Sequence, residues 1–373
     1  MTPLEAATHA DPYPYYARLR DHQGLMFDAD LGLWVASCAE TVEAVLAHPD
    51  CRVRPPHEPV PKAIAEGAAG QVFARLMRMN EGSAHRCPRA FIEPALIAVE
   101  VQQVADRVAR LIDSVDNLDT LMFGLPVSVV ASLLGFPTDQ LASVARLTRD
   151  FVACLSPLSN AAQLRHADAG ASHLKQMLGA LFEETALLTH IRSGDWQDAD
   201  VLAANLIGLL SQTCEATAGL IGNTLVMLAR RPDLVDRIRH TPALAAALVE
   251  EVARYDSPVQ NTRRFVAERC MIGNCVLAAG DSVLVLLASA NRDRAANPSP
   301  DSFLLERAQR RVFSFGSGRH QCPGQRLALS IAAQALSALL QRQPDLLASA
   351  GQFSYWPSLN SRIPRFHSVA LNQ

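Results

Sequence analysis

The sequence predicts a mainly α-helical protein with a minor β region, folded as one domain over residues 1–373. Apolar residues recur at helical spacing along most of the chain, strand signals are few and short, and no change of composition marks a linker. Hydrophobic residues make up 49% of the chain and charged residues 19%. This is enough apolar material for a large core, and it excludes a disordered protein.

The predicted helices are amphipathic or apolar segments. The segment 199–230 is unusually long and apolar around most of its circumference, so we expect it to be buried through the middle of the molecule. It should end at Arg230-Arg231-Pro232, because proline stops a helix and cations suit its C-terminus. In chain order the expected helices cover residues 11–20, 38–48, 100–115, 139–155, 168–193, 199–230, 242–255 and 324–342.

The predicted strands are short. Gly32–Ser37 (GLWVAS) is one, and Cys270–Val276 followed by Ser282–Ala288 predicts a hairpin that turns at Ala279-Gly280-Asp281. The tail after Arg342 mixes proline, serine and aromatic residues without a clear period.

Charge and hydropathy exclude two classes of partner. The net charge is −3, without the basic excess of a nucleic-acid-binding chain. The N-terminus lacks the pattern of a secretory signal, and the apolar stretches 121–137 and 275–291 are interrupted and shorter than a span of about 20 residues. We therefore expect a cytoplasmic protein with no nucleic-acid or membrane partner, and with reduced cysteines.

The segment Val312–Leu329 (VFSFGSGRHQCPGQRLAL) carries the strongest chemical signal. Its glycine-rich stretch leads into a helix, and Cys322 lies two residues before the expected helix start at Gly324. Unpaired N–H groups and the positive end of a helix dipole stabilise a thiolate. Such a loop suits the presentation of one thiolate to a soft metal, although a lone cysteine in a tight turn is more often structural.

The motif Phe315-Gly316-x-Gly318-x-His320-x-Cys322-x-Gly324 resembles the haem-binding loop of the cytochrome P450 family. The resemblance implies the haem-thiolate fold of that family, haem b as cofactor and Cys322 as the axial ligand of its iron. It also implies haem contacts from Phe315, Gly316, His320 and Gly324.

Two further segments resemble the family, in the right order. Glu251-Val252-Ala253-Arg254 resembles its ExxR motif, in which the two charges share a helix face and can pair. The stretch FLLER, which ends at Arg307, resembles the one that supplies a third, arginine partner. We interpret Glu251, Arg254 and Arg307 as a buried structural network whose loss damages folding and haem incorporation.

Haem propionates require cationic or hydrogen-bonding partners. The segment MNEGSAHRCPR resembles the family segment in which a histidine and an arginine, here His85 and Arg89, reach the propionates from one helix face. Arg264 stands where the family places another propionate arginine, with Arg263 as the competing choice, and His320 is the fourth candidate.

The chain departs from the family on the long helix that resembles the distal one. Members carry a small residue, glycine, any residue, an acid and threonine, whereas this sequence has Gln212-Thr213-Cys214-Glu215-Ala216. Alanine cannot donate the proton that the threonine hydroxyl helps to deliver. Glu215 with Thr213 or Thr217 are the proton-delivery candidates, although Thr217 points about 100° around the helix from position 216.

Four interpretations of this departure remain open. Thr213, three residues before Ala216, supplies the hydroxyl from one turn away, or it bonds back to its own helix, as Ser and Thr often do. Alternatively, a substrate hydroxyl completes the relay. Finally, the reaction is atypical: desaturation, coupling, ring formation or peroxide-driven oxidation.

The resemblance implies a monooxygenase-type oxidoreductase (EC 1.14) that oxidises a small organic substrate with O2, and we expect a natural-product intermediate. With no flavin or iron–sulfur motif in the chain, electrons would come from ferredoxin and ferredoxin reductase. Four arginines near the cysteine loop would form a basic patch for an acidic ferredoxin: Arg310, Arg311, Arg319 and Arg326. The expected substrate-pocket residues are Leu209, Gln212, Ala216, Val259, Gln260 and Asn261.

Two rival classes remain. The first is a haem protein of the same fold that is peroxide-driven, or that binds or senses a ligand without oxidising it, and Ala216 keeps it open. The second is a recruitment module that has lost its haem, which the presence of Cys322, His320, His85 and Arg89 disfavours.

Overall fold

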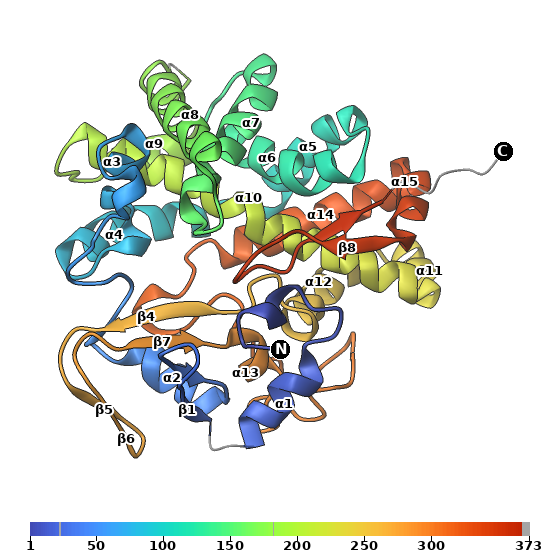
Figure 1. Cartoon of the computed structure of the whole chain (residues 1–373). Coiled ribbons are helices and arrows are strands. Elements are labelled where there is room, and N and C mark those ends of the chain that lie inside the picture. The colour runs from blue at the N-terminus through green and yellow to red at the C-terminus, as the bar shows by residue number, and fades with distance from the viewer. Residues whose placement is uncertain (22–23, 182, 368–373) are drawn as a thin grey trace. The chain divides into compact units, whose positions relative to one another are not determined.

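The computed structural model describes residues 1–21, 24–181 and 183–367. The chain divides into two compact units. Figure 1 shows the whole chain, coloured by residue number. Unit 1 comprises Met1–His57, Gly222–Cys322 and Ser349–Gln373, and unit 2 comprises Glu58–Ile221 and Pro323–Ala348. The expectation of one domain over the whole chain stays a prediction. Helices predominate in the described residues and the sheets are small, which confirms the predicted fold class.

Unit 1 is built around a five-stranded sheet in the order β1-β2-β7-β4-β3. The pair β2–β7 is parallel and the other neighbours are antiparallel. Helix α2 packs its apolar face against the sheet, so that Val42 and Leu46 share one buried cluster with Val283 and Val285. The strands are β1 (Leu25–Asp28), β2 (Leu33–Ala36), β3 (Cys51–Arg52), β4 (Thr262–Val266) and β7 (Ser282–Val285).

Two antiparallel hairpins complete the β structure of unit 1: β5 (Cys270–Ile272) with β6 (Cys275–Leu277), and β8 (Phe353–Tyr355) with β9 (Pro364–Phe366). The helices of this unit are α1 (Tyr13–Asp21), α2 (Ala39–Ala47), α11 (Pro232–His240), α12 (Leu244–Tyr255) and α13 (Leu287–Asn291).

The predicted hairpin around residues 279–281 is wrong. The chain already reverses inside the predicted first strand, because Gly273 adopts φ +56° and lets β5 fold back on β6. Strand β7 pairs instead with β2 and β4, as Figure 1 shows for β4 and β7. The Gly-Asn pair at Gly273-Asn274 is a known two-residue turn signal that the prediction missed.

Unit 2 is helical. Helix α14 packs against α5 and α6, and α7 packs along α8. The helices are α3 (Ala68–Arg75), α4 (Ser83–Ile97), α5 (Val101–Leu111), α6 (Leu125–Leu133), α7 (Leu141–Val152), α8 (Ala161–Gly179), α9 (Ala186–Arg192), α14 (Gln325–Arg342) and α15 (Pro344–Ala348). Helix α10 runs from Ala199 to Arg230, as predicted, and its residues up to Ile221 belong to unit 2.

The single helix predicted over 168–193 is wrong. Helix α8 begins earlier, at a capping box formed by Asn160 and Gln163, and it ends at Gly179. Helix α9 starts afresh because the Thr185 hydroxyl accepts the N–H of Leu188 at 3.2 Å as an N-cap. Residue 182, within the predicted helix, lies outside the described residues.

In the part of the chain that the structure describes, no helix combines the length and apolarity that a membrane crossing requires.

Candidate functional site

The cysteine loop of unit 1 is held by its own backbone. The N–H of Cys322 donates to the carbonyl of Phe315 at 2.9 Å, and the N–H of Gly316 donates to Phe313 at 2.7 Å. Gly316 and Gly318 adopt φ values of +70° and +68°, in the left-handed region that favours glycine. The motif glycines therefore allow the tight turns that lead to Cys322, which is partly exposed and forms no disulfide among the described residues.

Two cationic candidates of unit 1 accompany this thiol. Arg264 is only 6% exposed, whereas the neighbouring Arg263 is exposed, because successive side chains alternate across strand β4. His320 is partly buried in the loop itself. A single thiol for iron and cationic groups for propionates is the donor chemistry that a haem requires, so these residues fit the group. The alternation also favours Arg264 over Arg263.

Helix α4 of unit 2 carries His85 and Arg89. His85 is buried, while Arg86 is exposed, as a solvated charge would be. Arg89 makes a bidentate ion pair with Glu93, at 2.7 Å from Nη2 to Oε1 and 3.0 Å from Nε to Oε2. Sequence reasoning missed Glu93, although it lies at the i+4 spacing of a helical ion pair. This ion pair uses the Nε and Nη2 edge of the guanidinium.

The structure brings Glu251, Arg254 and Arg307 together. Glu251 and Arg254 are both 0% exposed, and the Arg254 guanidinium donates to the Glu251 carboxylate at 2.7 and 3.1 Å. Arg307 reaches the same carboxylate at 3.2 Å. The network has a fourth member, Arg310, whose Nε donates to Glu251 at 2.9 Å and whose Nη1 pairs with Glu250 at 2.6 Å.

Backbone groups complete the network. The carbonyl of Pro300 accepts from Arg254 at 2.7 Å, and the N–H of Leu304 donates to Glu251 at 3.1 Å. Burial alone would raise the pKa of Glu251, but the hydrogen bonds and charge of Arg254, with the other donors, hold that pKa below its ordinary value. The carboxylate is therefore charged and fully paired.

Three of the four arginines of the predicted basic patch make contacts within the protein, and the patch itself stays a prediction. Arg310 belongs to the network, and Arg311 pairs with Glu43. Arg319 caps helix α2 by donating to the carbonyl of His48 at 2.8 Å, where a cation suits the negative end of the helix. Arg311 and Arg326 are exposed, Arg326 on helix α14 of unit 2. Sequence proximity to the loop could not show which charges were already used.

The polar turn of α10, Gln212–Thr217, lies within unit 2. The Thr213 hydroxyl donates to the carbonyl of Leu209 at 2.8 Å, and the Gln212 amide donates to Gly208 at 3.0 Å. Thr213 thus bonds back to its own helix, one of the two interpretations left open for it. Ala216 is partly buried and Thr217 is 1% exposed.

Glu215 is the charged residue of this turn. Its side chain is exposed, but neighbouring protein atoms displace part of the water around its carboxyl, and this desolvation raises the pKa of that carboxyl. The charges of Arg78 and Arg149 act in the opposite sense without cancelling it. Burial likewise raises the pKa of the neighbouring Cys214 thiol to about 12, so that thiol stays neutral. A carboxyl with a raised pKa can hold a proton closer to neutral pH than an ordinary glutamate.

Two of the expected pocket residues have internal roles. Gln260 is 0% exposed, and its amide accepts from the Tyr16 hydroxyl at 2.9 Å and donates to the carbonyl of Ser257 at 2.7 Å. Both ends of the amide are therefore used inside unit 1, and its assignment to the substrate pocket stays a prediction. The amide of Asn261 donates to Leu359 at 2.8 Å. Leu209 is buried and Val259 partly buried, and their assignment stays a prediction.

Comparison with known proteins covers most of the chain. A family model described as Cytochrome P450 matches residues 106–343. The chain is 29% identical to Cytochrome P450 monooxygenase PikC of Streptomyces venezuelae, over 94% of this chain and 88% of that protein. It is 27% identical to the 20-oxo-5-O-mycaminosyltylactone 23-monooxygenase of Streptomyces fradiae, over 92% and 85%.

The fold is similar to that of a solved structure, P450BioI in complex with an acyl carrier protein ligated to hexadec-9Z-enoic acid. The TM-score is 0.82 at 25% sequence identity, over 95% of this chain and 97% of that chain.

Proposed function

The chain belongs to the cytochrome P450 family of monooxygenase-type oxidoreductases, and from that premise we propose that it oxidises an intermediate of natural-product biosynthesis with electrons from a ferredoxin and its reductase. The family implies a thiolate-ligated haem, substrate, O2 and external redox partners. The observation that carries the proposal is the Cys322 loop, because its glycine conformations and its reduced, partly exposed cysteine fit a haem-thiolate centre. Haem b as the cofactor type and a cytoplasmic location are parts of the same proposal.

When bound, the haem supplies the oxidising chemistry, and the chain positions substrate and delivers protons. We assign the iron to Cys322 and the propionates to His85, Arg89, Arg264 and His320. Phe315, Gly316 and Gly324 complete the loop around the cofactor.

Proton delivery is assigned to the carboxyl of Glu215. Its raised pKa lets it hold a proton at a higher pH than an ordinary glutamate, whereas Ala216 has no hydroxyl and Thr213 donates to Leu209. Thr217 is the remaining hydroxyl candidate on this turn, although it lies one residue around the helix. A hydroxyl of the substrate would complete the relay in the position that Ala216 leaves without one.

The substrate class rests on the similar proteins. One of the two Streptomyces relatives is named for oxidation of a mycaminosyltylactone, and P450BioI was solved with a carrier-bound fatty acid. We assign a mid-sized organic molecule of this general kind, contacted by Leu209, Gln212, Ala216, Val259 and Asn261.

The ferrous carbon-monoxide difference spectrum tests the proposal. We expect a strongly red-shifted Soret band in the wild type and in Cys275→Ala, a matched variant that removes another partly exposed thiol. The band should vanish in Cys322→Ala, because the thiolate ligand is lost. A haem-free wild type, or the same spectrum in Cys322→Ala, would overturn the assignment.

A second candidate, peroxide-driven oxidation, is favoured by one observation: the turn that usually carries the threonine has Ala216, and Thr213 is bonded to its helix. Product formation with a surrogate ferredoxin system and dioxygen supports the first proposal. Product formed only with hydrogen peroxide supports the second. Ligand binding without product under either condition would indicate a non-oxidative sensor.

A further inference from the structure

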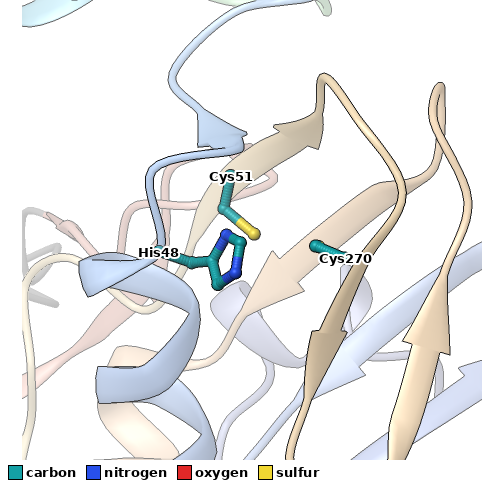
Figure 2. Close-up of side chains that lie close together, drawn as sticks. All are labelled: His48, Cys51 and Cys270. Atoms are coloured by element: carbon teal, nitrogen blue, oxygen red, sulfur yellow. The ribbon is translucent and has the colours of Figure 1, made fainter.

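Three metal-ligating side chains meet within unit 1, apart from the cysteine loop. His48 follows helix α2, Cys51 begins strand β3 and Cys270 begins strand β5. One ring nitrogen of His48 and the two sulfurs all lie within 4.8 Å of one another. Figure 2 shows the Cys51 sulfur beside the His48 ring, with Cys270 on a separate strand, β5. The sequence separates Cys270 from the other two, so only the fold brings the set together.

The burial and the ligand types of this cluster suit a cation that prefers soft ligands. Cys51 is 0% exposed, and His48 and Cys270 are partly buried. Two thiols and an imidazole select zinc or monovalent copper over the hard cations that prefer oxygen ligands. The thiols come from two different strands, so a bound ion would join segments that are distant in the chain.

We propose that His48, Cys51 and Cys270 bind one thiophilic d10 cation, Zn²⁺ or Cu⁺, at a site separate from the haem-thiolate centre. Three ligands complete a trigonal Cu⁺ site. For Zn²⁺ they leave a fourth tetrahedral position for water.

Asp50 provides the outer support that such a histidine normally has. In the structure its backbone N–H donates to Nδ1 of His48 at 3.2 Å, and its carboxylate Oδ2 lies 3.9 Å from the same nitrogen. If the metal binds through Nε2, the proton moves to Nδ1, the hydrogen bond from the Asp50 N–H is given up, and Nδ1 donates to this carboxylate after a small movement. A carboxylate behind the imidazole fixes the ring and strengthens it as a ligand.

The site lies where it can stabilise the cysteine loop. Arg319, three residues before Cys322, donates to the carbonyls of His48 and Cys51 at 2.8 and 3.4 Å. A metal bound to His48, Cys51 and Cys270 fixes the backbone against which Arg319 rests. We therefore assign the ion a structural role in unit 1, and no part in the oxidation.

The experiment uses the haem-loaded, full-length chain. Reduced protein is incubated with one equivalent of Zn²⁺, or anaerobically with Cu⁺, and is then dialysed against a competing chelator before metal analysis. The test variants are Cys270→Ser and His48→Gln, which alter partly buried side chains and are tolerated better than a change at Cys51. The control is Cys87→Ser, which removes an exposed thiol outside the site.

We expect about one retained ion per chain in the wild type and in Cys87→Ser, and affinity lower by at least about 100-fold in Cys270→Ser and His48→Gln. X-ray absorption at the zinc edge should give sulfur neighbours at about 2.3 Å and nitrogen at about 2.0 Å. Retention by copper alone, with zinc lost, would assign the site to Cu⁺.

Three results would overturn the proposal. One is equal metal retention by the wild type and both test variants. Another is a zinc spectrum without sulfur neighbours. The third is failure of the reduced wild type to retain either metal, together with a mass loss of two hydrogens on air oxidation, which would identify Cys51 and Cys270 as a disulfide pair. Because metal content is measured on folded protein, these results do not depend on the substrate or the electron donor.

Discussion

The Glu251 network of unit 1 and the polar turn Gln212–Thr217 of unit 2 hold their carboxyl groups in opposite ways. Three arginines and a backbone N–H surround Glu251, and its pKa is held low. Glu215 makes no ion pair among the described residues, and burial raises its pKa. A carboxylate that is fully paired is fixed in one protonation state and suits a structural role, whereas one that is crowded but unpaired can exchange a proton.

The largest loss of stability should follow from removing the carboxylate of the Glu251 network. Glu251→Ala leaves three guanidinium groups without their shared carboxylate, and we expect destabilisation of about 3–5 kcal/mol with loss of bound haem. Urea unfolding and the haem content of purified protein measure both. Because the folded-state pKa of Glu251 is lowered, its stabilisation is complete above the ordinary carboxyl pKa and is lost as pH falls through the lowered value.

The difference in stability between wild type and Glu251→Ala should therefore narrow in acid. A difference that stays constant down to the pH of acid unfolding would contradict the charged, paired state of this carboxylate.

The sequence could predict the members of this region that follow a motif. The i, i+3 spacing placed Glu251 with Arg254, and the proline at 232 marked the end of α10. The place of Arg310 in the network was missed because the sequence shows a charge but not its burial. For the same reason the sequence suggested that Arg319 is a surface charge, although it binds the carbonyl of His48.

Side-chain partners were harder to predict than elements. The sequence left the Thr213 hydroxyl with two outcomes, and only the helix geometry shows that Leu209 accepts it. Gln260 looked like a polar anchor, yet Tyr16, distant in the chain, binds its amide. The β5–β6 turn carried a readable Gly-Asn signal, whereas the His48, Cys51 and Cys270 cluster depends on strand pairing that no local pattern specifies.

The second prediction concerns the polar turn Gln212–Thr217 and tests Glu215→Gln. Without a proton-exchanging carboxyl, we expect product formed per electron consumed to fall by roughly tenfold or more. In the wild type this coupling should fall as pH rises through the raised pKa, because Glu215 then loses its proton, and in the variant it should stay low and flat. Coupling that is unchanged in Glu215→Gln at every pH would remove Glu215 from proton delivery.

The effect of Glu215→Gln on stability should be opposite in sign to its effect on coupling. The raised folded-state pKa of Glu215 makes wild-type stability fall as pH rises from the ordinary carboxyl pKa through the raised value. The glutamine of Glu215→Gln does not titrate, so the variant does not lose stability in this way. Its melting temperature should therefore rise relative to that of the wild type as pH increases across this range. Parallel melting curves across the same pH range would show that the carboxyl is not desolvated.

The third prediction concerns Thr213→Val. The hydroxyl donates to Leu209 within the same helix, so its loss should change stability by no more than about 1 kcal/mol and leave coupling unaltered. The matched control is Ser211→Ala on the same helix, because the Ser211 hydroxyl likewise donates to a carbonyl of its own helix, that of Gly208. Uncoupling by Thr213→Val at unchanged stability would restore Thr213 as the replacement for the missing threonine.

The smallest change in stability should come from Glu250, at the solvent-exposed edge of the Glu251 network. Glu250 is 46% exposed and bonds Arg310 at 2.6 Å from the solvent side, so Glu250→Gln should change the free energy of unfolding by at most about 1 kcal/mol. The neighbouring Glu251 carboxylate still neutralises Arg310, and salt should abolish what effect remains. Urea unfolding at low and high salt measures it. An effect of Glu250→Gln as large as that of Glu251→Ala would extend the structural network to the surface and weaken the contrast between a buried, paired carboxylate and an exposed one.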